Sequence, residues 1–261
     1  MQKKTLFIAL LLTGGALASC QPGSGSASGN GDDTTAQAAG DASAASAAAG
    51  QNQLSDQEKS DGWQLLFNGQ NLDGWRGYKN GATTAWEAMN GTLHCDGHKK
   101  DAPAVDLITN DEYQSFELSL AWKISPASNS GIMFHVNEKY PTSSVSGPEF
   151  QIIDDEGWPG KLEDWQHTGC NYAMQLPTSR PVKAVGEWNT TRIVVNGAHV
   201  EHWLNGEKIL EYEMWSPEWE KQKASGKWKD HPEYGMSKSG HIALQYHGGD
   251  VWFRDIKLKK L

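Results

Sequence analysis

The sequence has few cysteines, no surplus of basic charge and no long apolar run. Its 261 residues include 3 cysteines, and 32 acidic side chains outnumber 23 basic ones. Nucleic-acid binding requires clustered Lys and Arg, so the formal net charge of -9 argues against a nucleic-acid partner. A polytopic membrane protein would need several apolar runs of about 20 residues, and the sequence contains none of that length.

Several common catalytic motifs are also missing. The sequence has no Gly-rich phosphate loop, no Gly-x-Ser-x-Gly elbow, no His-Glu-x-x-His and no cysteine pair with zinc spacing. We therefore predict no cofactor and no metal centre. One alternative stays open, because Asp154-Asp155-Glu156 offers the hard oxygens that calcium prefers. A solvated acidic loop is the commoner explanation of such a run.

The N-terminus has the layout of a secretory signal. Lys3 and Lys4 precede the short apolar run Leu6–Leu12, and small residues follow. The tetrad Leu17-Ala18-Ser19-Cys20 resembles the lipobox of bacterial lipoproteins, in which the Cys carries the acyl chains after cleavage. We predict a signal peptide over residues 1–19 and lipidation of Cys20. An ordinary cleaved signal peptide is the alternative.

The residue after the predicted lipidation site bears on localisation. Gln21 stands there, and in many Gram-negative bacteria the absence of Asp at this position resembles passage to the outer membrane. We expect a cell-envelope protein that meets the membrane through its lipid anchor only. Which face of the outer membrane it occupies is not specified by the sequence.

A linker follows the anchor and precedes a single folded domain. Residues 21–50 contain no aromatic and no basic side chain, and all 12 Trp and 9 His lie after residue 60. A segment without apolar side chains to bury does not offset its ordering entropy. We predict a flexible linker over residues 20–60 and one domain over residues 61–261. Cys95 and Cys170, its two cysteines, form either a disulfide or two buried thiols.

The domain shows the period-two alternation of β-strands. In the clearest case Phe116, Leu118, Leu120, Trp122 and Ile124 alternate with more polar residues. Similar runs cover residues 132–136, 149–153, 192–195, 199–204, 209–212, 241–247 and 252–258, with Asn-Gly turns between some of them. Only Pro217–Lys223 looks helical. The pattern predicts an all-β sandwich or jelly roll.

Polar side chains recur on one side of several predicted strands. His135 opposes the apolar residues of its run, as do Glu149 and Gln151 on theirs and Gln245 and His247 on theirs. If these strands share a sheet, the residues line one surface, and such a surface suits a sugar, whose hydroxyls need planar polar partners. An ordinary solvated sheet face is the alternative.

An ordered set of segments gives a closer indication. The set resembles the 3-keto-disaccharide hydrolase domain family over nearly all of residues 62–261, and its segments are Trp63–Gly69, Leu72–Trp75, Asn129–Ile132, Gly147–Asp154, Gly186–Asn189, Trp203–Gly206, Gly240–Gly248 and Val251–Ile256. The resemblance implies a concanavalin A-like, laminin G-like jelly-roll β-sandwich. It also implies cleavage of glycosides already oxidised at C3, by C2-proton abstraction, β-elimination and hydration.

The resemblance also implies catalytic roles. Glu149 and Asp154 match the family pattern Glu-x-Gln-x-x-Asp, and we expect Glu149 to act as acid or base. His135 is expected to assist Glu149 or to polarise the ketone. His247 is expected to be a base or an orienting group. The family commonly has Asp where Tyr246 stands, so His247 lacks the carboxylate partner that this Asp would supply.

Further residues are expected to bind the substrate. Asn129 would donate a hydrogen bond near the developing oxyanion, Gln151 and Gln245 would bind hydroxyls, and His167 would lie near the cleft. The tryptophans divide into two predicted groups. The core group is Trp75, Trp86, Trp122, Trp188, Trp203 and Trp252. The group in loops, available for stacking on sugars, is Trp158, Trp165, Trp215, Trp219 and Trp228.

A non-catalytic, lectin-like carbohydrate-binding domain is the alternative function. This type of sandwich is widely used for binding, and fold alone does not fix function. Binding needs aromatic and amide groups, whereas catalysis also needs titratable groups in mutual reach. The carboxyl and imidazole groups named above favour an enzyme.

Overall fold

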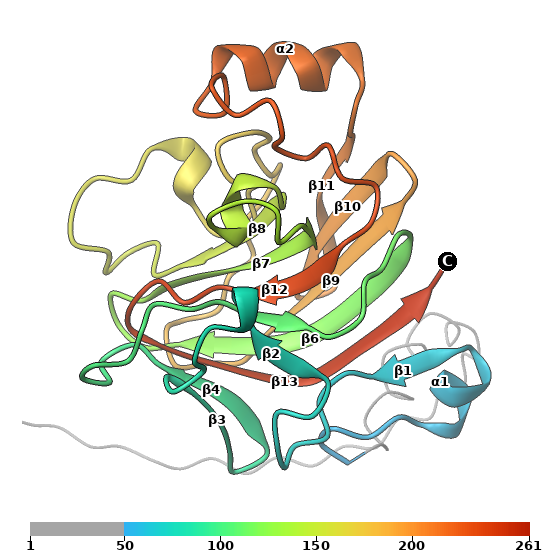
Figure 1. Cartoon of the computed structure of the whole chain (residues 1–261), viewed down its shortest axis with the longest axis vertical. Helices are drawn as coiled ribbons and strands as arrows, with labels where there is room; N and C mark the ends of the chain where they lie inside the picture. The colour runs from blue at the N-terminus through green and yellow to red at the C-terminus, as the bar shows by residue number, and fades with distance from the viewer. Residues whose placement is uncertain (1–49) are drawn as a thin grey trace, which may run out of the picture. The chain divides into compact units, whose positions relative to one another are not determined.

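The computed structural model describes residues 50–261, which form two antiparallel β-sheets (Figure 1). The larger sheet has the strand order β11-β10-β9-β6-β13-β4-β3, with β1 also paired to β13. Its strands are β1 (Trp63–Leu65), β3 (Trp86–Met89), β4 (Thr92–Asp96), β6 (Phe116–Ile124), β9 (Asn189–Asn196), β10 (His199–Leu204), β11 (Glu207–Glu213) and β13 (Asp250–Lys260).

The smaller sheet has the strand order β2-β5-β12-β7-β8. Its strands are β2 (Trp75–Gly77), β5 (Leu107–Thr109), β7 (Asn129–Val136), β8 (Glu149–Ile153) and β12 (His241–Leu244). The helices are α1 (Asp56–Ser60), α2 (Pro217–Ser225) and the short 3-10 turns η2 (Tyr78–Asn80), η3 (Ser143–Val145) and η4 (Asp164–Gln166). None of the helices in residues 50–261 is long and apolar enough to cross a membrane.

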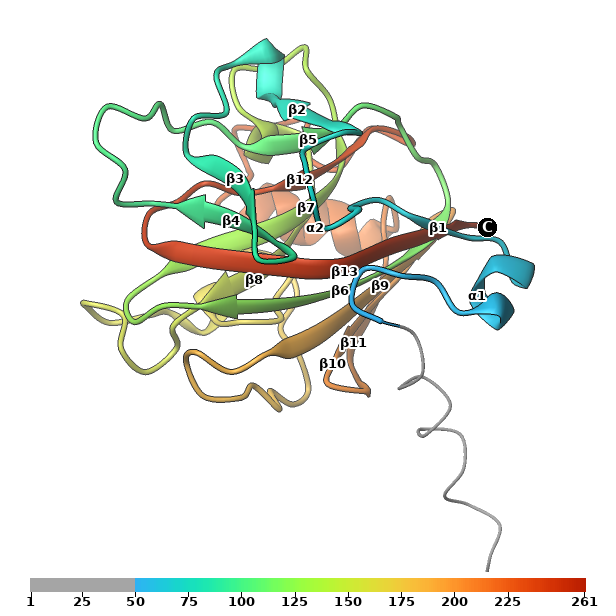
Figure 2. The same ribbon diagram turned by 90° about the horizontal axis from the view of Figure 1, so that it is seen from below.

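The predicted all-β, jelly-roll-like sandwich is confirmed. Every second residue of β6, from Phe116 to Ile124, points into one core together with Phe150 and Ile152 of the facing sheet. Figure 2 shows the two layers from a second direction, with β13 and β6 in one and β5, β12 and β7 in the other. Burying these apolar side chains supplies the main stabilisation of the fold.

The folded region begins earlier than the sequence indicated. Residues 51–60 were assigned to the linker, yet Asn52 is buried and exchanges two hydrogen bonds with Asp255, at 2.7 and 2.8 Å. Ser55 and Glu58 form a capping box that starts α1. Glu58 also pairs with Lys257. The signal peptide, Cys20 and the rest of the linker lie outside the described residues.

A β-bulge in β7 overturns the predicted facing of one strand. His241 pairs with Val136 and Ala243 pairs with Met133, so β7 carries one residue more than β12 between these pairs. His135 takes up the extra residue with φ of 53°. Strict alternation therefore fails: Val136 joins Met133 on the outer side, whereas the His135 ring turns toward Phe116.

A second bulge, in β13, changes the side on which Trp252 lies, a residue predicted for the core. The register with β6 shifts between Arg254 and Lys257, and Asp255 has φ of 54°. Val251 and Phe253 precede the shift and are buried in the core. Trp252 therefore points outward, where it stacks on His94 with ring centroids 4.9 Å apart.

The tryptophans consequently divide differently from the prediction. Trp75, Trp86 and Trp122 are buried as expected. Trp188 and Trp203 are only partly buried and stack on Arg254 and Arg192, at 4.1 and 3.9 Å from ring centroid to guanidinium. In the loop group, Trp219 is fully buried and stacks between Tyr212 and Tyr234, so it is not available to a sugar.

Of the two alternatives for the cysteines of the domain, a disulfide or two buried thiols, the structure shows two buried thiols. Cys95 and Cys170 are both free and both buried. Burial raises the pKa of the Cys170 thiol to about 12, so it stays protonated and unreactive at neutral pH. Both side chains behave as small apolar groups of the interior.

A buried histidine in β10 makes the fold sensitive to acid. The His202 ring lies against Phe150 and Tyr212 and donates from Nδ1 to the Gly169 carbonyl at 3.1 Å. Burial lowers the pKa of His202 to about 4. The unfolded chain, with an ordinary histidine pKa near 6.5, therefore binds a proton that the folded chain excludes.

We predict that His202 lowers the free energy of unfolding by on the order of 3 kcal/mol as the pH falls from 6.5 to 4. His202→Asn keeps a donor for Gly169 but does not titrate. Urea unfolding at pH 7 and pH 4.5 gives the free energy of unfolding at each pH. Its decrease from pH 7 to pH 4.5 should be smaller in this variant than in wild type or in the exposed control His98→Asn. Equal losses in all three proteins would contradict the prediction.

Candidate active site

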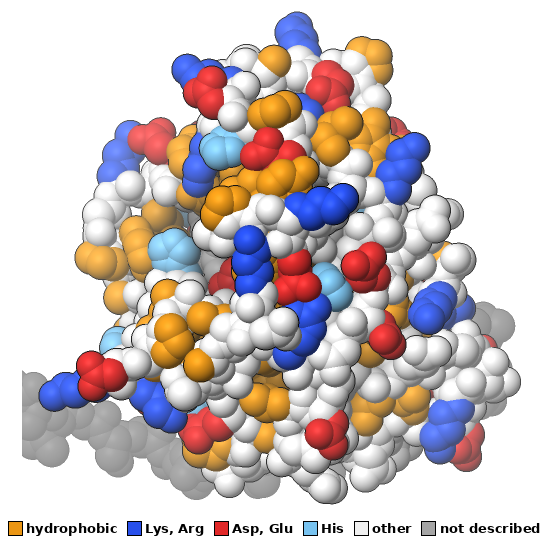
Figure 3. Space-filling model, viewed as in Figure 1, with side chains coloured by type: hydrophobic (Ala, Val, Ile, Leu, Met, Phe, Trp, Pro, Cys, Tyr) orange, Lys and Arg blue, Asp and Glu red, His pale blue; other side chains and the backbone are white. Residues whose placement is uncertain are grey.

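A cavity of about 300 Å³ opens on the outer side of the five-stranded sheet. Its floor comes from β7, β8 and the end of β12, and its walls come from η3 and the segments after β8 and α2. Figure 3 shows this hollowed face, with histidine and acidic side chains near the opening. The lining residues are Asn129, Ser144, Val145, Glu149, Gln151, Tyr172, Lys227, Trp228, His231, Gln245 and His247.

Strand register explains why the floor residues meet. Glu149 pairs with Met133, Gln151 pairs with Gly131, and residues opposite each other in antiparallel strands point to the same side. The structure thus brings five of the eight residues proposed for catalysis or binding to one cavity: Asn129, Glu149, Gln151, Gln245 and His247.

Glu149 occupies an unusual environment for a carboxyl group. It is 4% exposed and lines the cavity, and none of the described residues forms a hydrogen bond to its carboxyl oxygens. A Cβ on Gly131 would stand 2.0 Å from Glu149 Oε1, so only glycine leaves room for the carboxyl at this point of β7. Sequence alternation placed Glu149 on the correct side but did not indicate its burial.

Burial controls the charge of this group. It raises the pKa of Glu149 to about 8, the nearby charge of Asp106 adds to the rise, and Lys227 opposes it. A carboxyl with such a pKa is mostly protonated at neutral pH, yet it keeps an ionised fraction that is a stronger base than an ordinary carboxylate. This is the property required of a general acid–base catalyst.

Two amides in the cavity have buried oxygens without partners. Asn129 Oδ1 and Gln245 Oε1 are inaccessible to solvent and accept no hydrogen bond from the described residues. Buried acceptors normally have donors, so an unpaired one is costly. A ligand rich in hydroxyl groups would supply the missing donors. Gln151 is already oriented, because its Nε2 donates to the Gln166 carbonyl at 3.1 Å.

The walls of the cavity contain residues that the sequence analysis missed. Lys227 lies over Tyr172, 4.2 Å from the ring centroid, and donates to the Tyr172 hydroxyl at 3.1 Å. Trp228, one of the loop tryptophans proposed for stacking, packs on Tyr234 with centroids 4.0 Å apart. Tyr172, Lys227 and His231 have no motif or alternation around them, so no sequence signal identified them.

His135 does not belong to this site, contrary to the sequence analysis. It is 1% exposed, does not line the cavity, and donates from Nε2 to the Gln114 carbonyl at 2.7 Å. Its ring packs edge-on against Phe116 and Phe134. The β7 bulge is the physical reason, because it reverses the side on which residue 135 lies.

Asp154 is largely buried, and its carboxylate is engaged in structural hydrogen bonds. Its carboxylate accepts hydrogen bonds from the backbone N–H groups of Ala127 and Gly157, both at 2.8 Å, and of Glu156 at 3.3 Å. These bonds hold the turn after β8 and use the oxygens that a calcium ion would need. Asp154 does not line the cavity of Glu149.

His167 lies at a second cavity, of about 810 Å³, which shares no lining residue with the first. His167 Nδ1 is 2.9 Å from Asp155 Oδ1, which also accepts the Thr168 N–H. Asp154 lines this second cavity as well. The cleft position expected for His167 is therefore at a different opening from that of Glu149.

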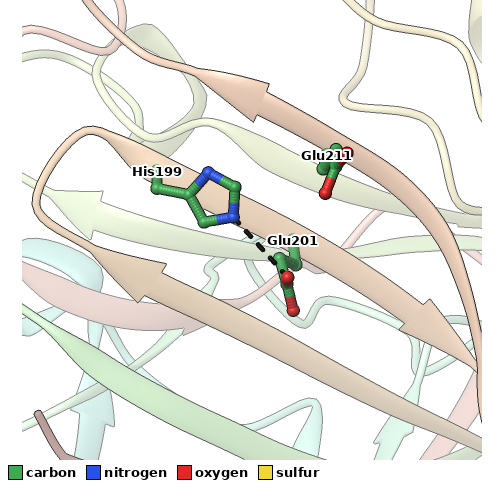
Figure 4. A group of neighbouring side chains, drawn as sticks. All are labelled: His199, Glu201 and Glu211. Atoms are coloured by element: carbon green, nitrogen blue, oxygen red, sulfur yellow. Dashed lines mark ion pairs between the residues drawn. The ribbon is translucent and has the colours of Figure 1, made fainter.

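One group in residues 50–261 has the composition of a metal site. His199, Glu201 and Glu211 on β10 and β11 present ligand atoms within 4.8 Å of one another (Figure 4). Lys208 already bridges the two glutamates, and His199 Nδ1 pairs with Glu213 at 2.6 Å. Because Lys208 and His199 already pair with these carboxylates, the partly exposed cluster supplies no argument for a bound ion.

The fold and the cavity together define a β-sandwich with a polar cleft that is lined by carboxyl and imidazole groups. Residues 62–259 match the model of the 3-keto-alpha-glucoside-1,2-lyase-like domain family, and the chain belongs to this family. The 3-keto-disaccharide hydrolase of Bacteroides thetaiotaomicron is 30% identical over 290 aligned positions that cover all of both chains.

Two crystal structures from Parabacteroides distasonis, both of candidate glycosyl hydrolases, share the fold. One is 38% identical with a TM-score of 0.77, covering 81% of this chain and 100% of the other. The second is 30% identical with a TM-score of 0.60, covering 76% of this chain and 99% of the other. The resemblance inferred from the ordered segments is confirmed at the level of the family.

The raised pKa of Glu149 predicts a stability cost that grows with pH. A folded-state pKa of about 8 against an ordinary 4.5 means that stability is lost as the pH rises between these values. Glu149→Gln should therefore be more stable than wild type by on the order of 4 kcal/mol at pH 8, and about equal to it at pH 4.5. Urea unfolding at both pH values measures the difference. A variant less stable than wild type at pH 8 would refute the burial argument.

Proposed function

We propose that this protein cleaves glycosides whose sugar carries a ketone at C3, with the cavity of Glu149 as its active site. The observation that carries the proposal is a buried carboxyl without hydrogen-bond partners, surrounded by amides and imidazoles. Membership of the family supports the substrate class, as does the name of the Bacteroides thetaiotaomicron relative.

A ketone at C3 makes proton transfer the central step of the reaction. The carbonyl acidifies the proton on C2, and ionised Glu149 removes it to give an enolate. The electron pair of the enolate forms the C1–C2 double bond and expels the glycosidic oxygen, which takes a proton from a water molecule oriented by His247 at the cavity mouth. The hydroxide formed in this step then adds to C1 of the enone while Glu149 returns its proton to C2. The net result is hydrolysis.

The remaining cavity residues would bind and orient the sugar. The unpaired oxygens of Asn129 and Gln245 would accept hydrogen bonds from sugar hydroxyls, and the Asn129 amide would donate to the enolate oxygen. Trp228 and Tyr172 provide aromatic surface on the wall. Positioning by several polar groups lowers the entropic cost of the proton transfer.

A lectin-like function would use the amides and aromatic residues but would not need Glu149. Burying a carboxyl without hydrogen-bond partners destabilises the folded protein, and sugar binding alone does not require such a group. This contrast favours an enzyme, and turnover of a keto-glycoside decides between the two functions.

We also propose that the protein is an envelope lipoprotein anchored through Cys20. The proposal rests on the basic start, the short apolar run and the tetrad Leu17–Cys20. The outer membrane is the proposed location, and carbohydrate is the proposed partner.

Wild-type protein should release aglycone from a 3-keto-glucoside and none from the unoxidised parent. Glu149→Gln should lose at least about 1,000-fold in kcat/KM, as expected for removal of a general base, while it retains binding. The exposed control Glu218→Gln should keep full activity. Sugar binding by all three proteins with turnover by none would establish the lectin-like function instead.

The pH dependence tests the direction of proton transfer. If ionised Glu149 is the base, kcat/KM should rise about tenfold per pH unit below the Glu149 pKa of about 8 and level off above it. An activity that falls above pH 8 would assign Glu149 as the acid rather than the base.

Cys20→Ser should abolish incorporation of radiolabelled palmitate and release the protein from the membrane fraction in a Gram-negative host. Cys95→Ser is the matched control, since it changes a different cysteine and should leave labelling intact. Unchanged labelling of Cys20→Ser would refute the lipid anchor.

A further inference from the structure

Asp106, which immediately precedes β5, is bound to two different walls of the Glu149 cavity. Its Oδ1 accepts a hydrogen bond from the Tyr246 N–H at 2.8 Å, and its Oδ2 accepts one from the Ser143 hydroxyl. Tyr246 stands between Gln245 and His247, which both line the cavity. Ser143 begins η3, whose other two residues also line it. One carboxylate therefore connects the end of β12 to η3.

The charge of Asp106 also acts on the cavity. Burial raises the pKa of the Asp106 carboxyl, while the hydrogen bonds from Ser143 and Tyr246 and the nearby His247 favour its ionised form and oppose the rise. Its negative charge contributes to the raised pKa of Glu149. Because the Glu149 side chain is almost fully buried, the charge of Asp106 is less screened there than it would be at the surface.

Other ionisable groups also face Glu149. Lys227, from the segment after α2, favours the ionised carboxylate, and the buried Tyr234 hydroxyl is itself affected by the Glu149 charge. Tyr172, His231 and His247 complete the ionisable lining of the cavity. Asp106 is the negative charge among these groups, and it is held rigidly by two hydrogen bonds.

We propose that Asp106 is a positioning residue of this site: its two hydrogen bonds fix η3 and the segment Gln245–His247 around the cavity, and its carboxylate is part of the electrostatic environment of Glu149. The part of this inference that concerns catalysis rests on the proposed function. The electrostatic part concerns Glu149 alone and does not depend on any substrate. The charge of Asp106 adds to the larger effect of burial in giving Glu149 a basicity suited to removing a proton beside a ketone.

The geometry allows the two roles of Asp106 to be separated by substitution. Asp106→Asn removes the charge, but its Oδ1 still accepts from the Tyr246 N–H and its Nδ2 donates to the Ser143 oxygen. Ser143→Ala keeps the charge and removes one of the two wall contacts. Asp111→Asn changes an exposed carboxylate of the loop after β5 and serves as the control.

The experiment is a ¹³C NMR titration of protein labelled at the glutamate side-chain carboxyl, with the Glu149 signal assigned by its loss in Glu149→Gln. In Asp106→Asn the titration midpoint of Glu149 should fall by about one pH unit. In Ser143→Ala and Asp111→Asn it should stay at the wild-type value. Far-UV circular dichroism confirms that each variant is folded.

Activity on a 3-keto-glucoside, measured on the same proteins, separates this inference from the proposed function. The rising limb of the kcat/KM profile should move to lower pH in Asp106→Asn. It should keep its position in Ser143→Ala while its plateau drops by roughly 3- to 10-fold through looser positioning. A fall in the NMR midpoint without turnover by wild type supports the effect of Asp106 and overturns the keto-glycosidase proposal. An unchanged midpoint in folded Asp106→Asn overturns the inference itself.

Discussion

The site depends on one unfavourable interaction, the burial of the Glu149 carboxyl without a hydrogen-bond partner. Gly131 leaves room for it on β7, and η3 together with the segments after β8 and α2 cover it. The surrounding β-sandwich tolerates the cost because its core is formed by other residues, on the opposite side of β7 and β8. The raised basicity of the carboxyl follows directly from its removal from water.

The same constraint links stability and function. A carboxyl that destabilises the folded protein as the pH rises is not retained for packing, because Gln would fill nearly the same volume without the charge. Unpaired amide oxygens beside it add a second cost of the same kind. Costs of this type are typical of sites that complete their hydrogen bonding only when a ligand binds.

The sequence predicted those parts of the structure in which local periodicity and tertiary structure agree. The alternation in β6 and β8 is regular, so Phe116–Ile124 and Glu149–Ile153 were assigned correctly to strands and sides. Alternation also placed Gln151 and Gln245 on the cavity side, whereas Asn129 was proposed from the family resemblance. The ordered segments, rather than any single motif, identified the family.

The errors have equally specific causes. One extra residue in β7 and one in β13 reverse the alternation, and no local pattern marks these bulges. His135 was therefore placed on the wrong side of its strand, and Trp252 was assigned to the core. Tyr172, Lys227, His231 and Asp106 come from loops or short strands whose place around Glu149 is set by tertiary contacts, so no periodicity could have indicated them.

The most direct test of proton abstraction by Glu149 isolates that step from bond cleavage. A 3-keto C-glycoside, which has no leaving oxygen at C1, is incubated with the protein in D₂O, and loss of its C2–H signal is followed by proton NMR. Wild type should accelerate exchange at C2 well above the uncatalysed rate, and Glu149→Gln should not. Equal exchange with both proteins, or aglycone release from a cleavable 3-keto-glucoside without any exchange here, would contradict the account.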